Sequence, residues 1–415
     1  MLKKDNHHTI VVQKFGGTSV QSAELREIAA QHVRSAVESG HKVVAVVSAM
    51  GRSNDPYSTD TLLGLIDGND AHVPKREQDL LQSCGEIISS VVFTNLLIGQ
   101  GLKASALTGK QAGFVTNDTF GNARITEMKT DAILERFKES DVLVVAGFQG
   151  ESTKGELTTL GRGGSDTSAT ALGAALNAKY VDIFTDVDGI MTADPRIVND
   201  AKPLKTLTYS EVSNMAYQGA KVIHPRAVEI AMYAKIPLRI RSLQSDSTGT
   251  LITMSRDQLP GSDVEERLVT GITYVKDISQ VTVQKAEDDH AAASLIFTKL
   301  AAEGISVDFI NISRYEVVFT VPMHKEQHVQ EAVKTLGYKA NLLPRCAKVS
   351  AVGAGMTGVP GVVSKITTAL HQEEIEILQA TDSHTTIWVL VREDEMDLAV
   401  NALHHMFRLA EEQNS

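Results

Sequence analysis

Short apolar runs alternate with longer helical patterns between Thr9 and about Asp257. The runs predict five strands, at Ile10–Gln13, Val43–Val47, Val142–Ala146, Val181–Thr185 and Pro237–Arg241. Several of them are apolar at every position, which is typical of strands that are covered on both faces. The alternation therefore predicts a mainly parallel sheet between helices, with ligands bound at the carboxyl ends of the strands.

The clearest helical pattern spans Arg76–Leu97. Its apolar residues recur at helical spacing and predict one stripe that faces the core. The stripe consists of Leu80, Leu81, Cys84, Ile87, Ile88, Val91 and Val92. Glu86 stands at its rim, and on this pattern alone most such glutamates are simply solvated.

A different organisation follows Ser255–Arg267, a polar segment with a Pro-Gly pair that predicts a linker. Beyond it, Val281–Val321 and Ala351–Val391 align at an offset of 70 residues, so that Ile296 falls on Ile366. Each copy has the order strand, helix, strand, strand. We therefore expect a duplicated β/α unit whose copies pair to bury their sheets, within the chain or between chains.

Composition and charge exclude several classes of protein. The chain has 415 residues, a formal net charge of −11 and no long Lys/Arg run, so we expect no nucleic-acid partner. Two cysteines, Cys84 and Cys346, are too few for a disulfide framework and are predicted to be free core thiols in a reducing cytosol. Met1–Thr9 lacks the apolar core of a signal peptide, and no apolar stretch reaches membrane-spanning length. These features predict a cytoplasmic protein without membrane contact.

Two glycine-rich segments indicate an anion site. Lys14 ends an apolar strand and precedes Gly16–Ser19, so its ammonium can reach a transferring phosphoryl group while the backbone approaches the phosphates. Gly161–Ser168 forms a second turn and opens an alanine-rich helix, whose N-terminus attracts anions. Three hydroxyl residues suit the N-cap of that helix: Ser165, Thr167 and Ser168. Each segment alone could be a flexible turn, but together they predict phosphate binding without a P-loop motif.

Two further motifs have competing interpretations. Asp186 follows a strand within Thr185–Gly189, where a carboxylate can meet a metal–nucleotide complex or a cationic partner. A calcium loop is excluded there because the register of carboxylates and the terminal Glu are missing. Gly353–Gly358 matches the dinucleotide fingerprint, but too little chain follows it to build a dinucleotide-binding sheet. A strand-to-helix turn that could cradle a small effector is predicted instead.

Several of these motifs resemble the signatures of the aspartokinase family. They are Lys14–Ser19, Val145–Gly150, Gly161–Asp166, Thr185–Gly189 and Gly219–Pro225. The resemblance covers essentially the whole chain and implies an α/β amino-acid-kinase fold over residues 1–257 and a linker over 258–267. It also implies two ACT-type, ferredoxin-like βαββαβ modules over 268–343 and 344–415, through which chains would pair as a homo-oligomer.

The resemblance assigns roles to matching positions. Lys14 and Asp186 would be catalytic, the first by stabilising the transferred charge and the second by organising the nucleotide site. The ATP-binding residues would be Lys14, Phe15, Gly16, Gly17, Ser48, Thr185, Asp186, Met191, Thr192, Ala193, Asp194, Pro195, Arg196 and Lys221. The aspartate-binding residues would be Ser48, Thr59, Glu86, Arg162, Gly163, Gly164 and Ser165. Arg162 suits the α-carboxylate because its planar fork bonds carboxylates in a bidentate manner, and Glu86 suits the α-ammonium.

These roles imply ATP-dependent phosphorylation of the β-carboxylate of L-aspartate to 4-phospho-L-aspartate, the first step toward lysine, diaminopimelate, threonine and methionine. A carboxylate is already an anion at neutral pH, so the reaction needs no general base. Catalysis reduces to alignment of two anions and stabilisation of charge on the phosphoryl oxygens. Mg²⁺ would bridge the phosphates and keep several waters, so no protein ligands of the metal are predicted.

Within the family, Asn54–Asp60, Leu81–Glu86 and Thr381–Trp388 resemble the diaminopimelate-inhibited isoenzyme of Gram-positive bacteria. This favours meso-diaminopimelate as the inhibitory amino acid over lysine or threonine. Many relatives have a Pro-Gly turn where this chain has Glu287–His290, which indicates an altered or differently specific effector site in the first module.

Two other functions compete with this interpretation. One is an amino-acid kinase acting on glutamate, N-acetylglutamate or carbamate, against which the duplicated C-terminal modules speak. The other is a non-catalytic amino-acid sensor, against which the intact Lys14 and Asp186 speak.

Overall fold

The structure is a computed structural model that describes residues 9–68, 71–220, 222–254, 268–353, 356 and 359–411. The described residues form two compact units. Unit 1 holds the described chain up to Ile190, Pro203–Ala216 and residues 222–254. Unit 2 holds Met191–Lys202, Tyr217–Ala220 and the chain from 268 onward. The predicted linker at 258–267 lies outside the described residues, and the predicted domain boundaries stay predictions.

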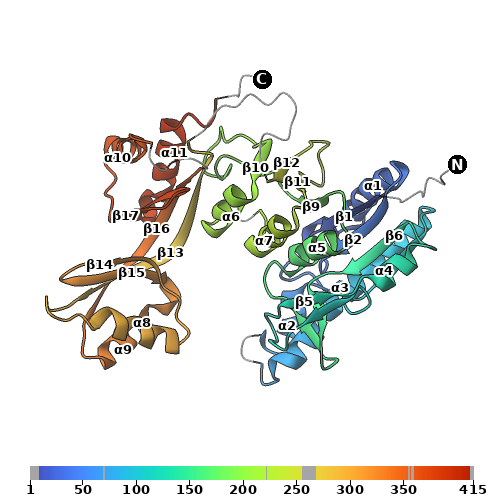
Figure 1. The fold of residues 1–415 in the computed structure, drawn as a ribbon, viewed down its shortest axis with the longest axis horizontal. Coiled ribbons are helices and arrows are strands. Elements are labelled where there is room, and N and C mark those ends of the chain that lie inside the picture. The colour runs from blue at the N-terminus through green and yellow to red at the C-terminus, as the bar shows by residue number, and fades with distance from the viewer. Residues whose placement is uncertain are drawn as a thin grey trace. The chain divides into compact units, whose positions relative to one another are not determined.

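Unit 1 is built on an eight-stranded sheet (Figure 1). Its order is β10 (Thr206–Thr208), β12 (Thr250–Thr253), β11 (Leu238–Ser242), β9 (Val181–Thr185), β1 (Ile10–Phe15), β2 (Lys42–Val47), β6 (Val142–Ala146) and β3 (Ala104–Leu107). The five predicted strands are confirmed as β1, β2, β6, β9 and β11. Neighbouring strands run parallel except for the pair β11 and β12. A smaller sheet joins β5 (Ile125–Met128), β4 (Phe114–Thr116), β7 (Gln149–Ser152) and β8 (Leu157–Thr159).

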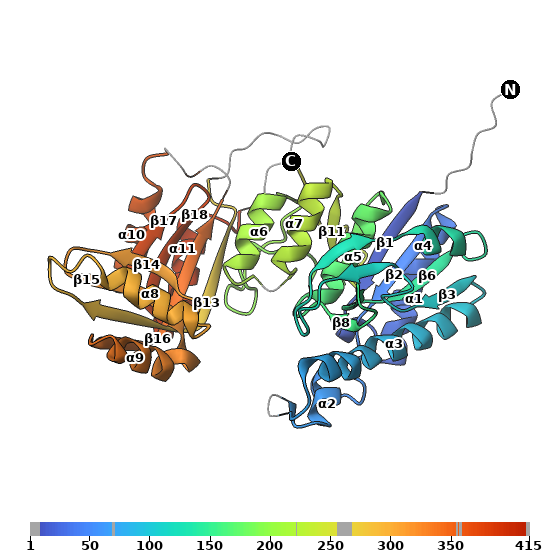
Figure 2. The same ribbon diagram turned by 60° about the horizontal axis from the view of Figure 1, so that its bottom comes forward.

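Helices cover both faces of the large sheet (Figure 2). On one face, α1 (Ala23–Glu38) and α3 (Lys75–Gly99) pack over Val11, Val43 and Val142. On the other face, α5 (Gly164–Ala175) packs against β1 and against α7 (Pro225–Ala234). Shorter helices are η1 (Gly17–Ser19), α2 (Thr59–Gly64), α4 (Asp131–Arg136) and α6 (Tyr209–Tyr217). A parallel sheet needs such two-sided cover because its strands are apolar throughout.

The long helix α3 does not bury its predicted apolar stripe. Leu80 and Val91 are 54% and 55% exposed, and Cys84 is exposed, whereas Ile88 and Val92 are partly buried and pack against the core of unit 1. The prediction of a core thiol at Cys84 is therefore wrong, and the predicted stripe faces the core only in part. The buried face instead carries small and polar side chains with a few apolar ones, among them Asp79, Ser83, Glu86, Ser90, Phe93 and Leu97. A period identifies a stripe but not the side that meets the sheet. Cys346 is buried, as predicted.

The apolar composition of α3 bears on the expectation that nothing in the chain spans a membrane. By length and composition alone, α3 could cross a membrane. Its buried carboxyl groups, on Asp79 and Glu86, instead mark it as a core helix of unit 1, because helices that span lipid rarely carry such groups.

Unit 2 confirms the predicted duplication. Its sheet has the order β14 (Asp308–Ile312), β15 (Glu316–Pro322), β13 (Gly271–Gln284), β16 (Ala340–Val352), β18 (Thr386–Arg392) and β17 (Gln379–Asp382). Helices α8 (Ala292–Ala302) and α9 (Glu326–Thr335) recur, starting 70 residues later, as α10 (Val362–Gln372) and α11 (Met396–Met406). The two copies are joined because β13 is long enough to belong to both (Figure 1). Its first part pairs with the end of β16, and its second part pairs with β15.

A segment between β9 and β10 packs inside unit 2. Ala193 and Val198 belong to the same apolar core as Ile366 and Val400 of the second copy. The backbone carbonyl of Thr192 accepts the N–H of Ile272 (2.8 Å). The hydroxyl of Thr192 bonds to Nε2 of His404 on α11 (2.9 Å). Residues 191–202 are therefore held by the duplicated part of the chain, although they interrupt the sequence of unit 1.

Candidate active site

A cavity of about 560 Å³ opens in unit 1 at the carboxyl ends of β1 and β2. It contains all seven residues predicted to bind aspartate: Ser48, Thr59, Glu86, Arg162, Gly163, Gly164 and Ser165. Lys14 and Gly17 of the predicted nucleotide set also line it. The fold thus brings together segments that start at residues 14, 48, 58, 86, 148 and 161. Those at 14, 48 and 148 lie at the carboxyl ends of β1, β2 and β6, where ligands of a parallel sheet are expected.

Lys14 is fixed by a carboxylate that sequence reasoning missed. Its Nζ lies 2.7 Å from Oδ1 of Asp166, and both side chains are mostly buried. Asp166 stands in the first turn of α5, and its Oδ2 accepts the backbone N–H of His224 (3.4 Å). The pair places an oriented ammonium beside a helix N-terminus, an arrangement that suits a phosphoryl group. The sequence offers one signal for this partner of Lys14, namely that Asp166 directly follows Gly163-Gly164-Ser165.

Glycines bring the backbone close to the cavity at two positions. A Cβ on Gly17 would stand 2.6 Å from the carbonyl oxygens of both Ala49 and Gly51, so no side chain fits there. Gly163 has a φ of +68°, and a Cβ on it would meet the Cβ of His224 at 2.2 Å. Only glycine adopts such a backbone without strain.

The N-terminus of α5 lacks the predicted side-chain cap. The N-cap residue is Gly163, and it makes no side-chain capping bond. Thr167 and Ser168 instead donate their hydroxyls to the carbonyls of Gly163 and Gly164 (3.0 and 2.9 Å). Hydroxyls within a buried first turn bond back in this way because the carbonyl four residues earlier is within reach. The prediction of a hydroxyl cap is therefore wrong, and the uncapped end suits an anionic ligand.

Glu86 is the most perturbed group in the cavity. It is 2% exposed, which corrects the view of it as a solvated glutamate. Its Oε1 accepts the backbone N–H of Ala49 (3.2 Å), while its Oε2 is buried with no partner among the described residues. Burial raises the pKa of this carboxyl to about 8. The ionised form of this buried carboxyl needs a cationic partner, because an unpaired buried charge is costly, and Oε2 is the oxygen that such a ligand would contact.

The remaining nucleotide residues of unit 1 lie around the strand ends. Phe15 is fully buried and stacks on Phe184, with ring centroids 5.0 Å apart, so its side chain belongs to the core. The Thr185 hydroxyl bonds to Oδ1 of Asp186 (3.1 Å). The Asp186 side chain is 70% exposed, and its Oδ2 lies 3.4 Å from a guanidinium nitrogen of Arg52. Its catalytic role stays a prediction.

The predicted nucleotide segment Met191–Arg196 belongs to unit 2. Within it, Asp194 accepts two bonds from the Arg196 guanidinium (3.0 and 2.6 Å) and one from the Tyr274 hydroxyl (2.9 Å). The Arg196 partner lowers the pKa of Asp194 to about 2. These bonds hold the segment in place within unit 2. Lys221, the last residue of the nucleotide set, lies outside the described residues.

Comparisons with known proteins identify the family. Residues 9–242 match the amino acid kinase family, and residues 342–405 match the ACT domain. The chain is 57% identical over 401 residues to Aspartokinase 1 of Bacillus subtilis, covering 97% of this chain and 99% of that protein. It is 39% identical over 416 residues to an aspartokinase of Corynebacterium glutamicum, covering 97% of each.

Solved structures agree with these relatives. E. coli aspartokinase III in complex with aspartate and ADP, described as the R-state, is 25% identical, with a TM-score of 0.76. The match covers 96% of this chain and 99% of that one. The same enzyme in complex with lysine and aspartate, described as the T-state, is 26% identical, with a TM-score of 0.73 over 95% and 99% of the two chains.

Proposed function

The chain belongs to the aspartokinases, is an aspartate kinase with ACT regulatory modules, and we propose that it phosphorylates the β-carboxylate of L-aspartate in the unit 1 cavity. The buried Oε2 of Glu86, which has no partner among the described residues, carries this assignment. It would receive the α-ammonium of aspartate, and Arg162 would receive the α-carboxylate in a bidentate manner. Both residues line the same cavity as Lys14. With its amino-acid end held in this way, aspartate would point its β-carboxylate toward Lys14.

The reaction then requires alignment rather than acid–base chemistry. An oxygen of the β-carboxylate bonds to the γ-phosphorus of ATP while the bond from that phosphorus to the bridging oxygen breaks, which releases ADP and 4-phospho-L-aspartate. No proton moves, because both reacting groups are anions. Lys14, oriented by Asp166, offsets the negative charge on the transferred oxygens.

We propose ATP with Mg²⁺ as the phosphoryl donor. Among the described residues no group of three His, Cys, Asp or Glu side chains is placed to hold a metal ion. We expect the Mg²⁺ to be carried mainly by the nucleotide phosphates and water, as is usual for this ion. The ion would neutralise phosphate charge as the two anions approach.

A turnover assay tests the proposal. ADP release is measured with the full-length protein, ATP, Mg²⁺ and L-aspartate, and in parallel with L-glutamate, N-acetylglutamate or carbamate. We expect ADP release that depends on aspartate and is much slower with the other acceptors. Turnover with glutamate or carbamate but not with aspartate would assign another substrate. Effector binding without any turnover would support a sensor instead.

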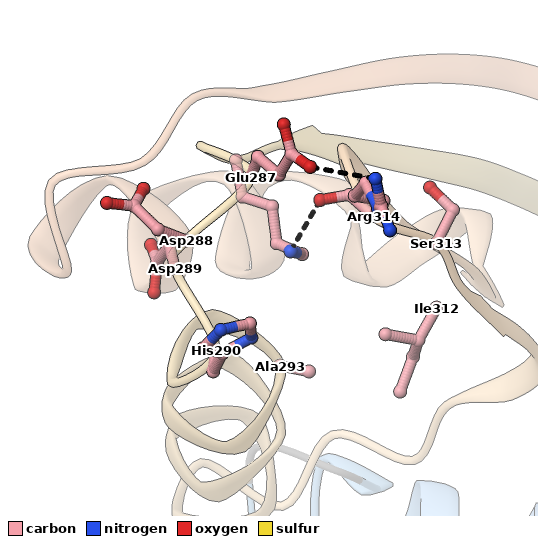
Figure 3. A pocket seen from close by; sticks show the side chains of 9 residues that line it. Glu287, Asp288, Asp289, His290, Ala293, Ile312, Ser313 and Arg314 are labelled. Carbon is pink, nitrogen blue, oxygen red and sulfur yellow. Dashed lines mark hydrogen bonds and ion pairs between the residues drawn. The ribbon is translucent and has the colours of Figure 1, made fainter.

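For regulation, a cavity of about 590 Å³ in the first ACT module is our candidate effector site (Figure 3). It is lined by Lys285, Glu287, Asp288, Asp289, His290, Ala293, Ile312, Ser313 and Arg314. Arg314 pairs with Glu287 (2.8 Å), and Lys285 donates to the carbonyl of Arg314 (2.7 Å). Charges of both signs suit an amino acid with two ammonium and two carboxylate groups. We therefore propose feedback by meso-diaminopimelate, as in the isoenzyme type that the sequence resembles.

An inhibition panel with meso-diaminopimelate, lysine and threonine tests this proposal. We expect meso-diaminopimelate to be the strongest inhibitor, and Arg314→Ala to weaken its inhibition without changing the uninhibited kcat. Lys299→Ala is a matched control, because Lys299 of α8 forms a surface pair with Glu303 and does not line this cavity. Stronger inhibition by lysine or threonine would reassign the effector. Inhibition that survives truncation after about residue 257 would exclude the ACT modules as its site.

We also propose that two chains pair through the ACT modules of a cytoplasmic enzyme. β14 is an edge strand of the unit 2 sheet, and its Ile310 and Ile312 are 49% and 56% exposed. An exposed apolar edge favours pairing with another chain. The solution mass of the full-length protein, compared with that of Ile310→Lys, tests the idea. A monomeric wild type, or a variant with the same mass as a dimeric wild type, would contradict it.

A further inference from the structure

A second buried carboxyl group lies on α3, seven residues before Glu86. Asp79 is fully buried and accepts three hydrogen bonds. Its Oδ2 accepts the backbone N–H groups of Gly121 (2.9 Å) and Thr159 (2.8 Å). Its Oδ1 accepts the hydroxyl of Thr159 (2.8 Å). Asp79 does not line the cavity, and the proposed reaction does not use it.

These bonds fix the end of β8, the strand that leads into the aspartate-binding turn. Thr159 is the last residue of β8. Its N–H and hydroxyl are held by Asp79, and its carbonyl accepts the N–H of Ala123 (2.8 Å). Every polar group of Thr159 is therefore occupied. Asp79 joins three segments that are distant in the sequence: α3, the loop around Gly121 and β8.

The turn after β8 rests on the same loop. A Cβ on Gly161 would stand 3.0 Å from Oδ1 of Asn122 and 3.1 Å from the carbonyl oxygen of Gly121. A second clamp comes from α7, where the Arg226 guanidinium donates to the carbonyls of Leu160 (3.1 Å) and Ala123 (3.0 Å). Arg162 directly follows Gly161 in this turn. The Gly121 loop, which Asp79 holds, therefore sets the position of Arg162.

Helix geometry links this arrangement to Glu86. Seven residues of an α-helix span nearly two whole turns, so Asp79 and Glu86 lie on the same face of α3. The helix presents Glu86 to the cavity directly, and through Asp79 it holds the turn that carries Arg162. One rigid element thereby positions both residues that are proposed to hold the α-amino-acid end of aspartate.

We propose that Asp79 is a positioning residue that fixes Arg162 relative to Glu86 and so sets the affinity for the α-amino-acid end of aspartate. This inference rests on the proposed function, which assigns those two residues to that end. Asp79 acts through Thr159 and not by touching substrate. Lys14 and Gly17 come from β1 and its following turn, to which Asp79 makes none of its three bonds, so ATP affinity is expected to be independent of Asp79.

Four full-length variants test the inference, each with KM for aspartate, KM for ATP, kcat and thermal midpoint. Asp79→Asn keeps the shape of the side chain but replaces one acceptor oxygen by an amide NH₂ group. That donor would face the donor groups of Gly121 or Thr159. Thr159→Val removes only the hydroxyl bond, and Thr159→Ser retains it. Asp182→Asn is the control for loss of a buried carboxylate, because Asp182 is equally buried but bonds to Arg239 away from the cavity lining.

We expect Asp79→Asn to raise KM for aspartate by about tenfold or more, because small misplacement of a binding group is costly. Thr159→Val should raise KM for aspartate by about fivefold, which corresponds to the loss of one hydrogen bond. Thr159→Ser should stay near wild type, and KM for ATP should change by less than about twofold throughout. Asp182→Asn should lower the thermal midpoint and leave KM for aspartate unchanged.

The inference is overturned if Asp79→Asn shifts both KM values equally or acts only on the thermal midpoint. Should Asp79→Asn fail to fold, the threonine pair decides, and equal KM values for aspartate in the valine and serine variants overturn it. Failure of the proposed function is a separate result, because wild-type protein would then show no aspartate-dependent turnover.

Discussion

Replacing Glu86 by glutamine removes a charge from the proposed ammonium site while it keeps the shape of the side chain. In the free enzyme, burial raises the pKa of the Glu86 carboxyl to about 8. At pH 7 roughly nine molecules in ten therefore carry a protonated Glu86. An ammonium beside Oε2 favours the ionised form, so binding of aspartate at pH 7 must first expel this proton.

The magnitude of the effect follows from that proton. Each pH unit below about 8 costs roughly 1.4 kcal/mol to ionise Glu86, so wild-type kcat/KM for aspartate should fall about tenfold per unit. Above that pH, Glu86→Gln loses an ionic hydrogen bond worth about 1.5–3 kcal/mol, which corresponds to about 10- to 100-fold in kcat/KM. The variant has no proton to expel, so the two enzymes should converge between about pH 6 and about pH 7.

The pKa shift also fixes the direction of the stability change. The folded protein holds the Glu86 proton more tightly than the unfolded chain, so wild-type stability falls as pH rises from the unfolded pKa of 4.5 through about 8. Glu86→Gln lacks this penalty. Its thermal midpoint relative to wild type should therefore increase as pH rises through that window.

Steady-state kinetics from about pH 6 to about pH 9 measure both effects, with KM for aspartate and for ATP determined separately. Glu135→Gln is the matched control, because Glu135 lies on α4 with a side chain that is 69% exposed. A Glu86→Gln enzyme with wild-type KM for aspartate above about pH 8 would refute the reasoning. A wild-type kcat/KM for aspartate that does not change with pH would refute it equally.

Three further predictions concern other parts of unit 1. Lys14→Ala should lower kcat at least about 10²-fold at saturating substrates, and a loss below about threefold in a turnover assay would remove Lys14 from catalysis. Gly163→Ala places a Cβ 2.2 Å from His224 at a φ of +68°, so denaturant unfolding should show a loss of about 1–3 kcal/mol, and unchanged stability would disprove the strain. Asp182→Asn leaves the half-buried Arg239 without its charged partner, and we expect urea unfolding to show a loss of stability of about 3–5 kcal/mol. A measured loss below about 1 kcal/mol would contradict this prediction.

The elements that depend on local pattern were predictable from the sequence. The five strands of the central sheet are continuous apolar runs, and a parallel sheet covered on both faces requires such runs. The duplication of unit 2 was visible because each copy repeats the same apolar spacing at one offset. The Gly163 turn was likewise readable, since glycines at the start of a helix indicate a backbone that approaches a ligand.

The features that depend on tertiary contact were not predictable. The stripe through Leu80 and Val91 suggested the core face of α3, but the helix turns its polar face inward, where Asp79 holds a turn and Glu86 meets the cavity. Periodicity cannot distinguish these outcomes, because both faces repeat at the same spacing. The partner of Lys14, Asp166, is 152 positions away and becomes visible only when β1 and α5 are packed together.

The place of residues 191–202 was hidden for a similar reason. They lie between two strands of unit 1, and nothing in their composition separates them from it. The apolar contacts of Ala193 and Val198 with the second ACT core, and the bond from Thr192 to His404, join positions about 200 residues apart. Sequence patterns register neighbours along the chain and not such contacts.

A crystal structure of the protein with L-aspartate, Mg²⁺ and a non-hydrolysable ATP analogue tests the central claim most directly. The claim predicts the α-ammonium against Oε2 of Glu86, the α-carboxylate on the Arg162 guanidinium and the β-carboxylate facing the γ-phosphoryl group beside Lys14. Aspartate bound outside this cavity, or bound with its β-carboxylate on Arg162, would contradict it.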